Sequence, residues 1–121
     1  MPTKALQEAK QALEELDLDL ILSAYAEKAV FEDFPAGLRI EDRWVLRDYF
    51  EKLFASPGVD FSCIRIFDGG DFAAIEWIWS GLKRDTGESF QVKGASVIEL
   101  ADGKIARESI YYDPASALIE D

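Results

Sequence analysis

The sequence predicts one α+β domain, in which helices come first and an antiparallel sheet follows. Apolar residues recur with helical spacing in the first half of the 121-residue chain, and they alternate with a period of two from residue 59 onward. Helices followed by a run of strands are typical of α+β domains rather than of repeated βαβ units. No internal repeat or Pro/Gly/Ser-rich linker divides the chain, so we expect one domain over residues 1–121.

The first half predicts three helices that share a buried side. One apolar helical face runs through Leu6, Ala9, Leu13, Leu16 and Leu20. Asp17 and Asp19 can end this helix and begin a second, short one up to Tyr25, because aspartate favours helix caps. Asp42 is a good N-cap for a third helix. The buried stripe of that helix would consist of Val45, Leu46, Tyr49, Phe50, Leu53 and Phe54.

Strands are predicted from the alternation of apolar residues and from the turns between them. A short strand, Val30–Phe34, precedes the third helix and is closed by a turn at residues 35–37. Four further strands form an antiparallel meander with Gly-containing turns; they are Phe61–Phe67, Phe72–Leu82, Phe90–Leu100 and Ile105–Tyr112. Asp113 and Pro114 then predict the N-cap and first position of a short tail helix through Ile119.

Composition excludes several classes of function. The net charge of −11 makes nucleic acid and anionic membranes poor partners. The chain has no histidine, which removes a Cys/His metal cluster and the Ser-His nucleophile arrangements. Cys63, the single cysteine, is expected to be a small buried hydrophobe. The sequence has no apolar span long enough for a signal peptide or a membrane helix, so we expect a cytoplasmic protein. We also expect that it uses no metal or cofactor.

Three stretches carry a resemblance to a known family. They read YAEKAVFED at residues 25–33, AAIEWIWSG at residues 73–81, and DGKI at residues 102–105 leading into YYD at residues 111–113. In order and spacing the chain resembles the nuclear-transport-factor-2-like superfamily, in its SnoaL-like polyketide cyclase and ketosteroid isomerase branch. The resemblance implies a cone, in which a curved antiparallel sheet wraps around three helices and a pocket. It also implies a homodimer through the outer sheet face, where Gln91, Lys93 and Glu99 would lie.

Strand alternation then assigns side chains to the pocket. On the short first strand Phe31 and Asp33 would point inward and Glu32 outward. The other inward positions would be Ile75, Trp77, Trp79, Val92, Gly94, Ser96, Ile98, Glu108, Ile110 and Tyr112. Tyr25 and Tyr112 could bind a ligand by hydrogen bonds or simply belong to the core. Trp77 and Trp79 share one face, which suits either a flat apolar ligand or an ordinary core.

Asp33 is the candidate catalytic residue. It matches the position at which the family's ketosteroid isomerases place their proton-abstracting base, and a carboxylate in an apolar wall can move a proton at a carbon next to a carbonyl. The alternative is that Asp33 caps the turn at residues 35–37. Glu108 could share a proton with Asp33, or it could lie at the rim and pair with Arg107 or Lys104.

The resemblance does not carry over the family's other catalytic groups. The isomerases' oxyanion donors, a helix tyrosine and a protonated acid, correspond to Ala9 and Ser96. The charged residues of the fold's epoxide hydrolases correspond to Trp77, Trp79 and Ile110, and the cyclases' acid also falls at Ile110. Three functions therefore stay open: proton transfer on a small apolar carbonyl compound with Asp33 as base, binding of an apolar ligand without chemistry, or a structural dimer with a vestigial pocket.

Overall fold

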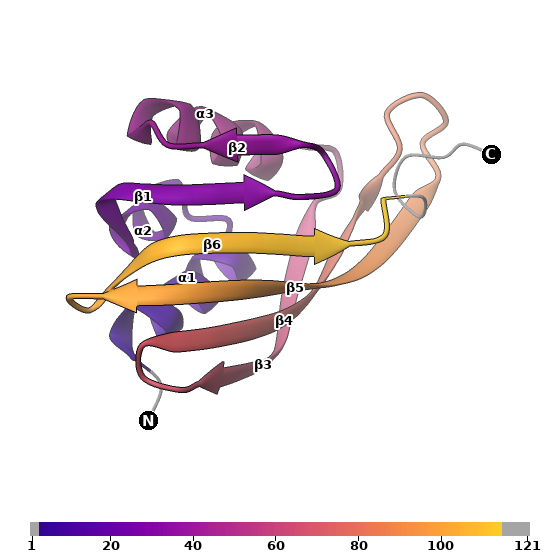
Figure 1. Cartoon of the computed structure of the whole chain (residues 1–121). Helices are drawn as coiled ribbons and strands as arrows, with labels where there is room; N and C mark the ends of the chain where they lie inside the picture. Colours follow the sequence, from indigo (N-terminus) through magenta and orange to yellow (C-terminus); the bar gives the residue numbers. More distant parts are fainter. Residues whose placement is uncertain (1–2, 115–121) are drawn as a thin grey trace.

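Within residues 3–114, which the computed structural model describes, three helices pack on one face of a six-stranded sheet (Figure 1). The strand order is β2-β1-β6-β5-β4-β3. The helices are α1 (Lys4–Glu15), α2 (Leu18–Ser23) and α3 (Arg43–Phe54). The strands are β1 (Tyr25–Asp33), β2 (Leu38–Ile40), β3 (Asp60–Asp68), β4 (Phe72–Leu82), β5 (Ser89–Ala101) and β6 (Lys104–Tyr112). The predicted α+β class and the curved sheet over three helices are confirmed.

Two aspartates set the helix boundaries, as the sequence predicts. The Asp17 carboxylate accepts a hydrogen bond from the Leu20 backbone N–H at 3.0 Å and caps α2. The Asp42 carboxylate caps α3 by accepting bonds from two backbone N–H groups of its first turn. The buried stripe predicted for α3 is wrong at one position: the Val45 side chain is 51% exposed. Val45 lies in the first turn of α3, whose buried residues are Leu46 and Phe50.

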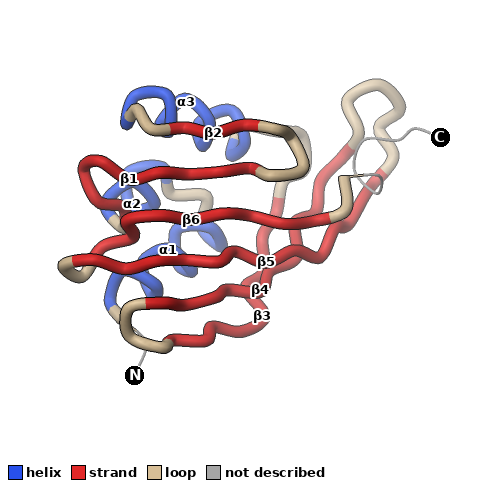
Figure 2. Tube along the Cα trace, in the orientation of Figure 1, coloured by secondary structure: helices blue, strands red, loops and turns tan. Residues whose placement is uncertain are grey.

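The antiparallel meander of β3, β4, β5 and β6 is confirmed, but the edge of the sheet beyond β6 differs from the prediction (Figure 2). β1 pairs with β6 in parallel and begins at Tyr25, which was expected in a helix. The reason is that α2 ends at Ser23 and the chain at once pairs with β6, since the Ile105 N–H donates to the Ala24 carbonyl at 2.9 Å. The short edge strand β2, which pairs with the end of β1, was not predicted.

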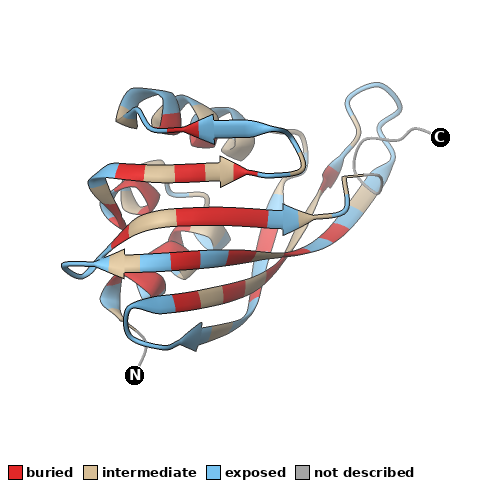
Figure 3. Ribbon diagram, viewed as in Figure 1, coloured by how far each residue is buried: buried red, intermediate tan, exposed pale blue. Residues whose placement is uncertain are grey.

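The concave face of the sheet is mostly apolar and buried, and the convex face is more exposed. Buried residues alternate with half-buried ones along β4 and mostly with exposed ones along β5 (Figure 3). Ile75, Trp77 and Ile98 lie in the core, whereas Lys93 and Glu99 are exposed on the other face. The predicted face assignment of these strands is therefore confirmed. Cys63 is buried as expected, and burial raises the pKa of its thiol to about 11.

The tail prediction falls mostly outside the described residues. The structure describes Asp113 and Pro114, whereas the expected helix through Ile119 lies in residues 115–121. In the part of the chain that is described, none of the helices has both the length and the apolar character needed to span a membrane.

Candidate functional site

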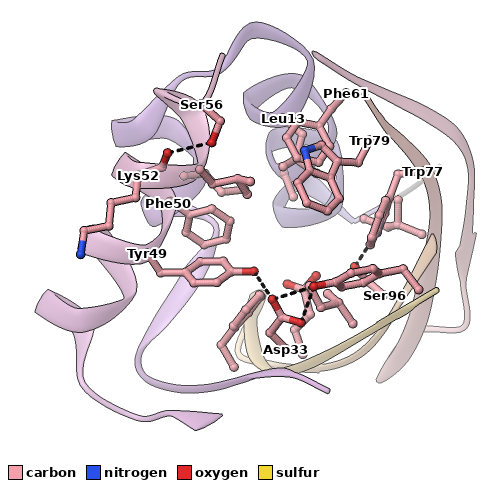
Figure 4. Close-up of a pocket in the computed structure, with 18 of the residues that line it drawn as sticks. Leu13, Asp33, Tyr49, Phe50, Lys52, Ser56, Phe61, Trp77, Trp79 and Ser96 are labelled. Atoms are coloured by element: carbon pink, nitrogen blue, oxygen red, sulfur yellow. Dashed lines mark hydrogen bonds between the residues drawn. The ribbon is translucent and has the colours of Figure 1, made fainter. Parts of the chain in front are cut away.

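A cavity of about 320 Å³ lies between the helices and the concave sheet face. Its volume is in the range of small-molecule sites. Most of its wall is aromatic or aliphatic, and its polar groups come from β1, β4, β5, β6 and α3 and from the loop residues Ser56 and Arg84 (Figure 4). The predicted pocket residues that line it are Tyr25, Phe31, Asp33, Trp77, Trp79, Ser96, Glu108, Ile110 and Tyr112.

Three of the predicted inward residues do not line the cavity: Gly94, Ile98 and Val92. Val92 is the one of them that was also predicted to belong to the pocket wall. It is buried on the concave face, directly across the ladder from Trp79. The much larger Trp79 indole lines the wall at this level instead, packed edge-on against Phe90 and Tyr112 at centroid distances of 5.0 and 5.8 Å. The alternation therefore placed Val92 on the correct face, but it could not show that a neighbouring ring forms the wall there.

Asp33 lies at the end of β1, and only 5% of its surface is exposed. The Tyr49 hydroxyl of α3 donates to one carboxylate oxygen at 2.8 Å, and the Tyr112 hydroxyl of β6 donates to the other at 2.9 Å (Figure 4). Burial and the nearby Asp33 charge raise the pKa values of both tyrosines. Both phenols therefore remain donors, and together they fix the position of the carboxylate in the cavity wall.

Asp33 also serves the turn that follows β1. The Ala36 backbone N–H donates to the same carboxylate at 3.3 Å, which matches the turn-capping alternative. A carboxylate has about four acceptor positions. The two tyrosines and this N–H occupy three of them, so Asp33 combines a turn cap with a polar position in the cavity wall.

Glu108 does not lie at the rim, so the rim position proposed from the sequence is wrong. It is buried with 7% of its surface exposed, and it accepts a hydrogen bond from the Tyr25 hydroxyl. The basic residues expected to pair with it have other partners: Arg107 pairs with Glu32 at 2.8 Å on the outer face, and Lys104 donates to the Ser23 carbonyl. Burial raises the pKa of Glu108, and its hydrogen bonds with Ser96 and Tyr25 oppose this shift without cancelling it.

Glu108 is joined by hydrogen bonds to Ser96 and Tyr25, and Ser96 to Trp77. When Glu108 is neutral, these four residues hold one more polar hydrogen than the hydrogen bonds among them use. The Trp77 indole N–H donates to Ser96 Oγ at 3.0 Å, and the hydroxyls of Ser96 and Tyr25 bond to the carboxyl group. These three bonds use three protons. A neutral Glu108 adds a fourth, which one member of the group can donate into the cavity that Glu108, Ser96 and Tyr25 all line.

Sequence reasoning missed Tyr49 as a site residue. Its position in the apolar stripe of α3 suggested core packing, and its ring does pack against Phe31 and Phe50. The available signal was its hydroxyl, because a buried tyrosine usually needs a hydrogen-bond partner. The other lining residues that were not proposed as pocket residues include Leu13, Lys52, Leu53, Phe61 and Arg84.

The positions at which the sequence resemblance places catalytic groups also lie at the cavity. Ala9 and Ser96 both line it, so the helix tyrosine of the isomerases has no counterpart at Ala9. Trp77, Trp79 and Ile110 line it as well, and all three are uncharged. Among residues 3–114, no group of three or more His, Cys, Asp or Glu side chains is arranged to hold a metal ion.

Comparisons with known proteins agree with this architecture. Similar solved structures include a protein with a ketosteroid isomerase-like fold from Catenulispora acidiphila, in complex with trimethylamine (TM-score 0.83, 16% identity, 96% of this chain and 90% of that one). An NTF2-like protein from Burkholderia thailandensis has a TM-score of 0.84 and 22% identity, and the match covers 96% of this chain and 93% of that one. An LEH-like epoxide hydrolase from M. tuberculosis has a TM-score of 0.75 and 20% identity, and the match covers 94% of this chain and 84% of that one.

These identities are low, so the three structures establish the fold and not the activity. No curated protein matches the chain. The sequence model of the SnoaL-like domain, however, matches residues 6–108, which include β1, α3 and most of the cavity wall. The chain therefore belongs to the SnoaL-like domain family, within the NTF2-like and ketosteroid isomerase-like fold.

Proposed function

We propose that this protein binds a small apolar carbonyl compound in the cavity and, without a cofactor, moves a proton at the carbon next to the carbonyl. Asp33 is the base. The observation that carries the proposal is that a fixed carboxylate and a separate group of buried hydroxyls line the same apolar cavity. We also propose that the protein acts in the cytoplasm.

The register of β1 against β6 gives the two polar groups a suitable separation. Asp33 pairs with Ile110, and Glu108 lies two residues earlier on β6, opposite Phe31. Adjacent strands are about 4.8 Å apart and a two-residue step is about 6.6 Å, so the two backbone positions are about 8 Å apart. A carbonyl oxygen and its α-carbon can lie between side chains that project from positions at this distance.

The proposed reaction needs no further reactant. Asp33 takes a proton from the α-carbon, the C–H electron pair forms a carbon–carbon double bond, and the carbonyl π electrons move to oxygen. When Glu108 is protonated, the spare proton of its hydrogen-bonded group hydrogen-bonds the enolate oxygen as its charge develops. Asp33 then returns its proton to the same carbon, or to the far carbon of an enone, and is regenerated. Tyr49 and Tyr112 hold the carboxylate throughout.

Exchange of the α-hydrogens of 1-tetralone in D₂O, followed by NMR, tests this proposal. Because general base catalysis typically contributes about 10²- to 10⁴-fold, Asp33→Asn should lower the protein-dependent exchange rate by about 100-fold or more. The matched control is Asp71→Asn, since Asp71 lies exposed beside the β3–β4 turn, outside the cavity wall. Exchange that is unchanged in Asp33→Asn would refute the role of Asp33.

A binding module without chemistry is the second candidate. It is favoured by the three donors that already occupy the Asp33 carboxylate, which would suit a purely structural acid. In this case 1-tetralone would bind the wild-type protein without faster exchange, and Asp33→Asn would keep its affinity. A cavity beside Asp33 argues against the third candidate, a structural dimer with a filled pocket.

We also propose a homodimer through the convex face of the sheet. Val97 of β5 and Tyr111 of β6 are 53% and 45% exposed there, and Tyr111 packs against the exposed ring of Phe34 at a centroid distance of 5.5 Å. The charged Lys93 and Glu99 lie on the same face of β5. Exposed apolar side chains gathered on one face mark candidate interaction sites.

A further inference from the structure

One buried donor in the cavity wall lacks a partner. Among residues 3–114, Trp79 Nε1 is the buried side-chain nitrogen or oxygen for which the protein supplies no hydrogen bond. A buried N–H group almost always has an acceptor in a native protein, and the exceptions call for an explanation. Trp79 lines the cavity, and Figure 4 shows its indole among the side chains around the open space.

The neighbouring donors do not share this property. The Trp77 indole N–H donates to Ser96, and the hydroxyls of Tyr49 and Tyr112 donate to Asp33. Two tryptophans two residues apart on β4 thus differ: the N–H of one is bound within the protein, and that of the other is unused. The difference indicates that Trp79 has an acceptor that the chain itself does not provide.

We infer that the ligand of this cavity is elongated and carries a second hydrogen-bond acceptor, remote from its reacting carbonyl, that accepts from the Trp79 indole N–H. This inference rests on the proposed binding of a carbonyl compound beside Asp33 and Glu108. It deepens that proposal by naming the substrate class: an apolar body with an acceptor oxygen toward each end.

The sheet register supports the elongated shape. Ser96, which bonds Glu108, pairs with Ile75 on β4, and Trp79 lies four residues farther along that strand. Four residues span about 13 Å of strand. The Trp79 ring packs edge-on against Tyr112, whose hydroxyl bonds Asp33, so the unused N–H and the candidate base belong to one continuous wall.

A matched pair of probes tests the inference on the wild-type protein. In 6-methoxy-1-tetralone the carbonyl and the ether oxygen lie at opposite ends of a bicyclic ring, and in 6-ethyl-1-tetralone a methylene replaces the ether oxygen. Isothermal titration calorimetry gives the affinity of each. Because satisfying a buried unpaired donor is worth roughly fivefold or more in an equilibrium constant, we expect the methoxy compound to bind tighter by at least that factor.

Two variants then assign the preference to one nitrogen. Trp79→Phe keeps an aromatic ring without the N–H and should abolish the methoxy preference, whereas Trp77→Phe should retain it. Equal affinities of the two probes for the wild-type protein would overturn the inference, as would a preference that survives in Trp79→Phe. The unsubstituted 1-tetralone exchange assay is independent of this ratio, so a failure of proton transfer and a failure of the Trp79 contact can be told apart.

Discussion

Glu108→Gln probes the buried acid on which the proposed reaction depends. Glutamine has nearly the same shape as glutamic acid and is neutral at every pH, so it reproduces the neutral carboxyl. Because burial raises the pKa of Glu108 in the folded protein, the folded state holds this proton at pH values where the unfolded chain has lost it. The stability that Glu108 contributes is therefore fully present below its unfolded pKa of about 4.3 and is lost as the pH rises through its folded pKa.

The size of the expected pH dependence follows from the single proton that Glu108 binds or releases. Between the unfolded and folded pKa values, the unfolding free energy of the wild type should fall relative to that of Glu108→Gln by up to about 1.4 kcal/mol per pH unit. Urea unfolding of both proteins at several pH values from 3 to 8 measures this difference. Glu32→Gln provides a control of opposite sign, because the Ser109 hydrogen bond and the charges of Arg107 and Arg39 lower the pKa of Glu32.

For Glu32 the stability is present above the unfolded pKa and is lost as the pH falls through its lowered folded pKa. Its difference should therefore grow with pH up to about the unfolded pKa and then stay constant, whereas that of Glu108 shrinks above the unfolded pKa. The reasoning on Glu108 is refuted if the difference between wild type and Glu108→Gln does not change with pH, or if it changes in the same direction as for Glu32→Gln.

Three further predictions concern packing, positioning and assembly. A Cβ on Gly94 would lie 2.4 Å from the Trp77 ring, so Gly94→Ala should cost about 1–3 kcal/mol in urea unfolding, and less in a Trp77→Leu background. Tyr49→Phe removes a donor to a buried carboxylate and should cost about 1.5–3 kcal/mol by the same measurement; an unchanged midpoint would contradict the contact. Val97→Glu on the convex face should convert a dimer to a monomer in analytical ultracentrifugation, and an unchanged mass would exclude this interface.

Local patterns in the sequence predicted most of the fold. The alternation along β4 and β5 placed Ile75, Trp77 and Ser96 on the concave face, because a strand with one buried face displays its burial with a period of two. The caps at Asp17 and Asp42 were equally local. The start of β1 at Tyr25 was not predictable in this way, since its first residues continue a helix-like pattern and its strand partner, β6, lies about 80 residues away.

In the candidate site too, local patterns predicted some features, and contacts between distant residues were missed. Side-chain direction placed Asp33 and Glu108 on the inner face, but their partners come from distant parts of the chain. Glu108 has basic neighbours in sequence, yet its hydrogen-bond partner Tyr25 is 83 residues away. Tyr49 approaches Asp33 only because α3 packs across the end of β1. Such contacts depend on tertiary packing, which cannot be deduced from the pattern of neighbouring residues in one sequence.

The central claim is that one cavity holds a carbonyl oxygen at the Glu108 group and its α-carbon at Asp33. A crystal structure with 1-naphthol tests it most directly, because this stable molecule has the planar shape of the enol of 1-tetralone. We predict its oxygen within about 3.2 Å of a Glu108, Ser96 or Tyr25 oxygen. Its C2 carbon should lie roughly 3–3.5 Å from the Asp33 carboxylate. A naphthol oxygen bonded elsewhere, or a ring held away from Asp33, would contradict the account.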